Sequence, residues 1–366
     1  MKEKLREELK VLTSMISVDG SEQEIGKYLY DRLQKVCDSV EVSPRGVVIG
    51  RIKGKQDGNK VMLSAHCDEI GFIVKNILSD GFIKFEKVGD YSDSVMAARK
   101  ILIQTDKGVI PGLIGQRASH IMTADERSRV QPSKNLYIDV GASSGEEVRA
   151  MGVKLGDKCV LQSDFMEMAN RDLVCTRALD DKTGCAILLN VAENIDRNLL
   201  KGELFIVFTV CEETTIAGLN AIVNVKKPDC VLVLDTVPCG DVPDVNTEVE
   251  LPVYMNRGPV LIIAMGEPWV EKYSQIHPRM REAFYGIADE MGFRFQELVI
   301  SENGYLTDEI GLLQAGFGTA AATLAIPRRY SHTPVELLNL NDAVKTYDVV
   351  KRFVEKCGDM KLNFFG

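Results

Sequence analysis

Short polar motifs follow or adjoin apolar, strand-like runs at five places in this chain, and this recurrence strongly constrains its fold. The first is His66-Cys67-Asp68-Glu69, which follows the apolar run Val61–Ala65. The others are Leu179-Asp180-Asp181-Lys182, Cys211-Glu212-Glu213-Thr214, Leu234-Asp235-Thr236 and Ser331-His332-Thr333. Open α/β sheets place ligand sites outside the carboxyl ends of their strands. We therefore expect an α/β fold whose sheet gathers these motifs at one edge.

Together the motifs provide two imidazoles and at least three carboxylates. Each motif alone is weak, because a single Glu-Glu pair usually starts a solvated helix and a single Asp-Asp usually lies in a turn. In combination they match the ligands that two divalent ions need when one carboxylate bridges them. Asp68 stands two residues after His66, where its carboxylate is placed to accept the second imidazole N–H and fix the tautomer.

Composition limits the classes of partner. The chain has 366 residues, 45% of them hydrophobic, which suits one large domain and a smaller second one. A net charge of −9 and the lack of a basic run argue against a nucleic-acid partner. The N-terminus has no apolar signal core, and no segment approaches the ~20 apolar residues of a membrane span. These features predict a cytoplasmic protein with no membrane partner.

The nine cysteines lack any Cys-x-x-Cys spacing, which argues against a disulfide framework and against a structural zinc knuckle. Four of them lie in or beside the polar motifs, where a nucleophile or a soft metal ligand is one interpretation; they are Cys67, Cys175, Cys185 and Cys211. Packing as small apolar side chains is the other interpretation and the one we favour, because buried free cysteine behaves as a small hydrophobe.

The pattern of predicted helices and strands changes twice along the chain. Residues 1–70 predict two helices, the second opened by a capping box at Ser21 and Glu24, and then strands over 46–52 and 61–65 with a turn-rich stretch between them. Residues 71–172 show short β-patterned runs with almost no helical periodicity. Strand–helix alternation resumes afterwards, so 71–172 is expected to be a β-rich domain inserted into a discontinuous domain of residues 1–70 and 173–366.

In the resumed part, periodicity predicts elements with the following bounds. The helices are expected over 183–195, 217–223, 277–291 and 340–356, and the strands over 203–210, 230–234, 259–264, 293–300 and 319–325.

At this point the motifs carry a family resemblance. AHCDEIG, RALDDKTG, VCEETTIAGL, LDTV and RRYSHTPVE, in this order, resemble the cytosolic aminopeptidases of metallopeptidase family 42, and the resemblance spans essentially the whole chain. Members are co-catalytic dimetal enzymes that often assemble as tetrahedral dodecamers. The resemblance implies a mixed-sheet α/β/α zinc-peptidase catalytic domain, with a small, barrel-like inserted domain that serves dimerisation and assembly.

The resemblance also implies roles for individual residues. Asp180 would bridge two divalent ions, with His66 and Asp235 on one ion and Glu213 and His332 on the other. Glu212 would be the general base, and Asp68 would support His66. The peptide bond between Asp180 and Asp181 would be cis, although a trans helix N-cap at Asp180 remains an alternative.

Two further residues are weaker candidates for substrate binding or for contact across subunits. His120 lies in a segment that resembles a family stretch reaching toward a neighbouring active site, and a local structural hydrogen bond is the alternative. Asp308 lies in Leu306-Thr307-Asp308-Glu309, where members usually carry Gly-Thr-Asp-Ala.

The expected function is hydrolysis of N-terminal residues from short peptides by water or hydroxide held between two metal ions, Zn²⁺ or Co²⁺, with a glutamate base. A dimetal carboxypeptidase or N-acyl amino acid deacylase is an alternative, and it would need an arginine or lysine to hold a free carboxylate. Arg257, Arg328 and Arg329 are the candidates for that clamp. A non-enzymatic scaffold is a third alternative, which the complete set of motifs disfavours.

Overall fold

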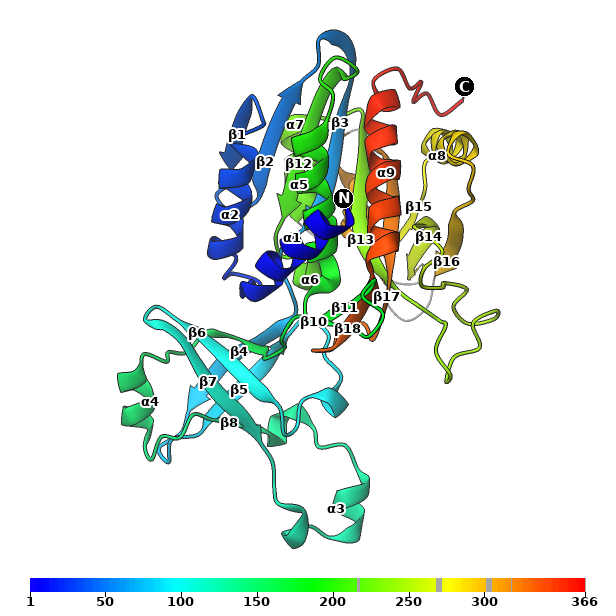
Figure 1. Ribbon diagram of the computed structural model, residues 1–366. Coiled ribbons are helices and arrows are strands. Elements are labelled where there is room, and N and C mark those ends of the chain that lie inside the picture. Colours follow the sequence, from blue (N-terminus) through cyan, green and yellow to red (C-terminus); the bar gives the residue numbers. More distant parts are fainter. Residues whose placement is uncertain (216–217, 268–271, 301–304, 317, 366) are drawn as a thin grey trace.

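The computed structural model describes residues 1–215, 218–267, 272–300, 305–316 and 318–365. It consists of a large α/β domain and a smaller barrel joined to it (Figure 1). The fold is therefore the mixed α/β class that the sequence predicts, with a β-rich domain beside it.

A 12-stranded mixed sheet forms the centre of the large domain. Its main path runs through β1 (Ser39–Val42), β2 (Val48–Lys53), β12 (Lys201–Thr209), β3 (Gln56–His66), β13 (Cys230–Pro238), β17 (Ala320–Arg329), β18 (Glu336–Asn339), β11 (Leu173–Thr176) and β10 (Met166–Glu167). β17 also pairs with β14 (Val260–Glu267), which in turn pairs with β15 (Lys272–Gln275) and β16 (Gln296–Ile300). The neighbouring strands β12, β3, β13 and β17 are parallel, so their carboxyl ends lie at one edge.

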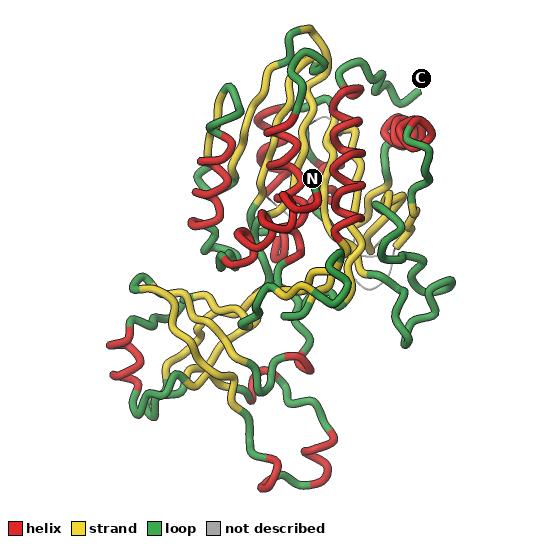
Figure 2. Tube along the Cα trace, in the orientation of Figure 1, coloured by secondary structure: helices red, strands yellow, loops and turns green. Residues whose placement is uncertain are grey.

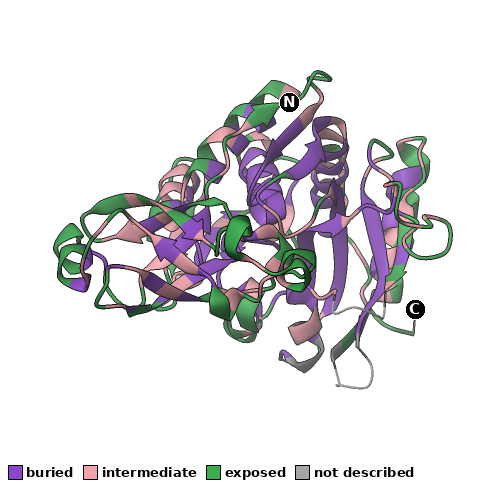
Figure 3. Cartoon of the chain, turned by 90° about the horizontal axis from the view of Figure 1, so that it is seen from below, coloured by how far each residue is buried: buried purple, intermediate pink, exposed green. Residues whose placement is uncertain are grey.

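Helices cover this sheet. They are α1 (Lys2–Ser14), α2 (Gln23–Leu33), α5 (Leu179–Asn194), α6 (Glu212–Thr215), α7 (Gly218–Lys226), α8 (Pro278–Glu290) and α9 (Leu340–Cys357). α5 packs on β3 and β13 and is itself covered by α1 and α9. Because α5 lies between these layers, nearly all of its side chains are buried. A polar side chain in such a position needs a hydrogen-bond partner within the protein. Figure 3 shows buried residues concentrated along the strands and the helix faces that meet them.

The small domain is a closed barrel with the strand order β4-β5-β8-β7-β6-β9. The strands are β4 (Gly71–Ile77), β5 (Ile83–Val88), β6 (Lys100–Thr105), β7 (Gly108–Gly115), β8 (Tyr137–Asp139) and β9 (Lys158–Leu161). The barrel has an apolar core of its own, and it carries two short helices, α3 (Ala124–Ser128) and α4 (Gly145–Met151) (Figure 2). Closure pairs the strand edges that an open sheet of this size would expose.

Several local predictions were wrong. β3 begins at Gln56 instead of residue 61, because the polar stretch expected to be a turn pairs with β12. The short exposed strand β1, whose polar-apolar alternation Ser-Val-Glu-Val spans only four residues, was not expected. Ser21 forms no capping box, since its hydroxyl donates to the Gln104 side chain of the barrel at 2.6 Å, and the helix begins at Gln23. The helix expected from Ala217 is described from Gly218, and Ala217 itself lies outside the described residues.

No helix within the described ranges combines the length and the apolar character needed to cross a bilayer.

Candidate active site

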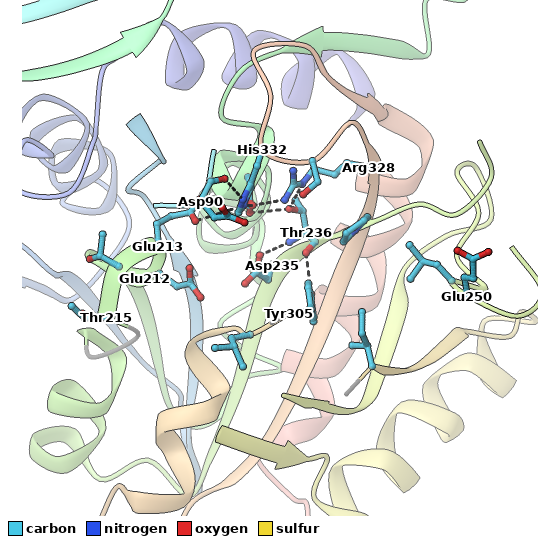
Figure 4. A pocket seen from close by; sticks show the side chains of 17 residues that line it. Asp90, Glu212, Glu213, Thr215, Asp235, Thr236, Glu250, Tyr305, Arg328 and His332 are labelled. Carbon is cyan, nitrogen blue, oxygen red and sulfur yellow. Dashed lines mark hydrogen bonds and ion pairs between the residues drawn. The ribbon is translucent and has the colours of Figure 1, made fainter. Parts of the chain in front are cut away.

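The polar motifs of the sequence meet at the carboxyl edge of the parallel strands. His66 ends β3, Asp235 lies near the end of β13, and His332 follows β17. Glu212 and Glu213 open α6 directly after β12, and Asp180 lies at the start of α5. A cavity of about 500 Å³ opens over this edge. Figure 4 shows the side chains of Glu213, Asp235 and His332 converging there, with Glu212 beside them.

Asp180 is the centre of the cluster, because each of its two oxygens faces one histidine. Oδ1 lies 3.4 Å from Nε2 of His66, and Oδ2 lies 3.3 Å from Nε2 of His332. The peptide bond between Asp180 and Asp181 is cis, as the family resemblance implied. Asp180 therefore lies between the two imidazoles, with one oxygen toward each.

The remaining carboxylates lie around the two histidines. Asp235 Oδ1 is 3.9 Å from His66 Nε2, and Glu213 Oε2 is 3.6 Å from His332 Nε2. Glu212 Oε2 lies 4.0 Å from His66 Nε2, at the wall of the cavity. The arrangement divides into a His66 side and a His332 side that share Asp180.

The second nitrogen of each imidazole faces a backbone carbonyl. His66 Nδ1 lies 3.1 Å from the carbonyl oxygen of Asp68, and His332 Nδ1 lies 3.0 Å from that of Asp90. The Asp68 carboxylate is 3.6 Å from His66 Nδ1 and instead accepts the backbone N–H groups of Glu212 and Glu213, each at 3.2 Å. Asp68 therefore contacts His66 through its main chain and holds the α6 turn through its side chain.

Burial and mutual repulsion dominate the charges of the cluster. Burial raises the pKa of Glu212 and of Asp235 well above the usual range, and burial raises that of Glu213 to about 7. Burial would also raise the pKa of Asp180, but the Arg328 guanidinium and the two histidines hold it well below its usual range. Burial opposes the charge of His332, yet Glu213 and Asp180 raise its pKa to about 9. Such crowding of like charges is typical of functional sites.

The donor set fits divalent ions. Ligand atoms of His66, Asp180 and Glu213 lie within 4.8 Å of one another. Glu213 Oε1 is buried with no hydrogen-bond partner among the described residues. A buried carboxylate oxygen without a partner is costly, and a cation would satisfy it. Imidazole and carboxylate together suit zinc and neighbouring divalent metals.

Sequence reasoning gave no role at the site to Thr236, Tyr305 or Glu336, and it named Arg328 only as a candidate clamp for a substrate carboxylate. Thr236 donates its hydroxyl to Asp180 Oδ1 at 2.8 Å, and the Tyr305 hydroxyl donates to the carbonyl of Thr236 at 3.0 Å. Arg328 and Glu336 form a buried ion pair beside Asp180. The motif RRYSHTPVE contains Arg328 and Glu336 four residues on either side of His332, and this spacing was the available signal.

The two weaker candidates lie elsewhere. His120 is exposed on the loop of the barrel domain and does not line the cavity. Asp308 is buried below the site, where it accepts the Thr209 hydroxyl at 2.6 Å, and it does not line the cavity either.

A second acidic group, Asp19, Glu22 and Cys211, lies behind the α6 turn. Asp19 already accepts the Cys211 thiol at 2.9 Å and the Thr214 hydroxyl at 2.6 Å. We assign no ion to this group.

A family model described as M42 glutamyl aminopeptidase matches residues 46–349. The chain belongs to this family. It is 31% identical over 331 residues to the putative aminopeptidase SgcX of Escherichia coli, an alignment that covers 89% of this chain and 87% of that protein. Membership makes the protein a hydrolase of the exopeptidase type and implies a divalent metal.

Solved structures of M42-like aminopeptidases have the same fold over nearly the whole chain. Aminopeptidase APDkam598 of Desulfurococcus kamchatkensis superposes with a TM-score of 0.91 at 29% identity, covering 97% of this chain and 95% of that one. The TET1 peptidase of Pyrococcus horikoshii, which can assemble into a tetrahedron or a large octahedral shell, superposes with a TM-score of 0.82 at 26% identity, covering 96% and 99%.

Proposed function

We propose that this M42 protein removes N-terminal residues from short peptides with two divalent ions, Zn²⁺ or Co²⁺, and with Glu212 as general base. The observation that carries the proposal is Asp180, whose two oxygens face two histidines at 3.4 and 3.3 Å while Glu212 borders the same cavity. His66 and Asp235 would hold one ion, Glu213 and His332 the other, and Asp180 both.

Such ions, when bound, would lower the pKa of the attacking water and polarise the scissile carbonyl. Glu212 takes the proton of the attacking water and then delivers it to the nitrogen of the leaving amine. Burial raises the pKa of Glu212 well above the usual glutamate range, which makes its carboxylate a stronger proton acceptor. The buried position of Glu212, 8% exposed, limits competition from bulk water.

The cationic groups of the chain favour an aminopeptidase over a carboxypeptidase or deacylase. Arg328 lines the cavity, but each of its three nitrogens already contacts Thr236, Glu336 or Asp180. Arg329 pairs with Asp241, and Arg257 stacks on the Tyr254 ring at 3.8 Å. The clamp for a free substrate carboxylate is therefore missing among these three arginines, whereas the acidic cavity suits a free ammonium.

We also propose that the protein works as a homo-oligomer assembled through the barrel domain, as dimers that build a dodecamer. The support is the relationship to the TET1 peptidase of P. horikoshii and the exposed apolar side chains of the barrel, such as Leu113 at 55% exposure.

The decisive experiment combines a substrate panel with one isosteric variant. Chelated enzyme reconstituted with Zn²⁺ or Co²⁺ should cleave aminoacyl-p-nitroanilides. Glu212→Gln should lose about 10²–10⁴-fold in kcat, because the amide cannot accept a proton, while metal analysis finds both ions retained. Loss of one ion in this variant would make Glu212 a ligand, and near-normal turnover would remove its role as base.

N-acetylated versions of the same substrates serve as the control. They carry no free ammonium, so an aminopeptidase should leave them intact. N-acetyl amino acids, which have the free carboxylate that the alternative requires, test the deacylase, and their preferential cleavage would support that alternative instead.

A further inference from the structure

Arg328 is a buried arginine, 2% exposed, at the end of β17. Its guanidinium contacts three segments of the site. Nε donates to the hydroxyl of Thr236 at 2.6 Å, Nη1 donates to Glu336 Oε1, and Nη2 donates to Asp180 Oδ2. Thr236 in turn donates to Asp180 Oδ1 at 2.8 Å. Arg328 therefore contacts one oxygen of Asp180 directly and the other through the Thr236 hydroxyl.

Glu336 extends this network to the backbone that carries two of the proposed ligands. Its Oε2 accepts the backbone N–H of Asp180 at 3.2 Å, and its Oε1 accepts the backbone N–H of His332 at 3.0 Å. Glu336 is 2% exposed and lies at the start of β18, which connects to β17 through the turn containing His332. One carboxylate thus fixes the main chain on which Asp180 and His332 stand.

We propose that Arg328 and Glu336 are a positioning pair that sets the metal affinity of the His332 side. The pair would hold Asp180 and His332 at their present separation before a metal arrives. This inference rests on the proposed dimetal function, and neither Arg328 nor Glu336 is a ligand in that proposal.

The alternative role of Arg328 is purely electrostatic, and it makes the opposite prediction. A guanidinium beside Asp180 repels an incoming cation, so removing its charge would tighten metal binding. A positioning role predicts weaker binding, because the carboxylate and the histidine lose the partners that orient them. Each oxygen of Asp180 has a second lone pair, so its contact with Arg328 leaves room for a metal.

The test compares Arg328→Lys and Glu336→Gln with the wild type by competitive chelator titration of metal-free protein. Lysine has one donor group and cannot reach all three partners, and glutamine keeps the shape of glutamate without its charge. Both variants should bind the ion on the His332 side about 10–100-fold less tightly, the range expected for residues that orient ligands. Excess metal should restore most of kcat, with KM within about twofold of the wild-type value.

Arg329→Lys is the matched control, because Arg329 is the next residue and pairs with Asp241 outside the Asp180 network. It should leave metal affinity unchanged. Circular dichroism and the unfolding temperature of each metal-free variant establish that the fold is retained. If Arg328→Lys fails to fold, the charge-neutral double variant Arg328→Met with Glu336→Met replaces it and should show the same loss of affinity.

Equal or tighter metal binding by the folded Arg328 and Glu336 variants would overturn the inference and leave the proposed function standing. If metal-loaded wild-type protein cleaves no aminoacyl substrate, the proposed function fails instead. The affinity comparison then still decides whether the pair positions a metal site.

Discussion

Glu22 shows how a single buried carboxylate can set the pH dependence of stability. It lies at the start of α2 and is 9% exposed, and its Oε1 has no partner among the described residues. Burial raises its pKa from about 4.5 to about 7, with Asp68 and Asp19 adding to the shift. The folded protein therefore keeps this proton over a range in which the unfolded chain has lost it.

The sign of the effect follows from linkage. Between about pH 4.5 and pH 7 the folded state binds more protons at Glu22 than the unfolded state does. The stability that protonated Glu22 contributes is therefore present below that window and is lost as the pH rises through it. Glu22→Gln cannot ionise. We expect the metal-free variant to exceed the wild type in unfolding free energy at pH 8 by an amount on the order of 1–3 kcal/mol, and to show little gain at pH 4.5.

Urea unfolding at the two pH values measures this difference. Glu24→Gln, an exposed position on the same helix, is the control and should change stability equally at both pH values. A gain of equal size at pH 4.5 and pH 8 for Glu22→Gln would contradict the titration.

That some candidate side chains lie close together could be predicted from sequence where each side chain follows its own strand. His66, Glu212 and Asp235 stand out because polar groups end apolar runs, a local pattern that sequence displays. Arg328 and Glu336 do not stand out in this way, because their importance lies in contacts with Asp180, which is far away in the sequence. The contact between the Asp90 carbonyl and His332 could not be predicted from sequence either, because every residue has a carbonyl oxygen.

At the scale of elements, the segment that follows β5 places the Asp90 carbonyl beside the His332 ring. Gly89 precedes Asp90 and has φ +79°, a left-handed conformation that favours glycine. A Cβ at this position would lie 2.4 Å from Cγ2 of Ile70. Both the left-handed backbone and the lack of space beside Ile70 therefore exclude larger residues at position 89.

Gly89→Ala should displace the turn and the Asp90 carbonyl, which lies 3.0 Å from His332 Nδ1. We expect at least about 10-fold weaker binding of the ion on the His332 side, because a ligand histidine loses the group that orients it. Chelator titration followed by metal analysis provides the measurement.

Gly141→Ala is a close control for conformational strain. Gly141 has φ +78°, and a Cβ there would meet nothing within 4 Å. It should cost about 1 kcal/mol of stability and leave metal binding unchanged. Equal metal affinities in the two alanine variants would remove the orienting role of the turn.

Prediction of elements followed the strength of their patterns. The long periodic helix α9 and the apolar strands β12 and β17 were expected close to their actual positions. The two-residue strand β10 and the exposed strand β1 form because neighbouring strands pair with them, and both are too short for their sequence pattern to predict a strand. Ser21 failed as a cap for a similar reason, because a residue of the barrel competes for its hydroxyl.

For the whole molecule, the outer face of β7 makes the assembly proposal testable. Val109 and Leu113 are 53% and 55% exposed on the same side of this strand, whereas Ile114 points inward at 1% exposure. Exposed apolar side chains of this kind mark interaction surfaces when they lie together.

Substituting both residues, Val109→Glu with Leu113→Glu, should reduce the assembly to smaller species, because burying two carboxylates in an interface is costly. Size-exclusion chromatography with light scattering measures the mass. Lys35→Glu, an exposed substitution on the large domain, should leave it unchanged. A monomeric wild type would refute assembly itself, and an unchanged mass in the double variant would place the interface elsewhere.

The distribution of the site along the chain has a consequence for biosynthesis. His66 belongs to an early strand, Glu212 and Asp235 to the middle of the chain, and His332 to the turn after β17, whose neighbour Glu336 begins β18. A polypeptide still on the ribosome thus lacks the last histidine and the pair that would position it until residues 328–336 have been made. The proposed ligand set therefore cannot be complete before that point of synthesis is reached.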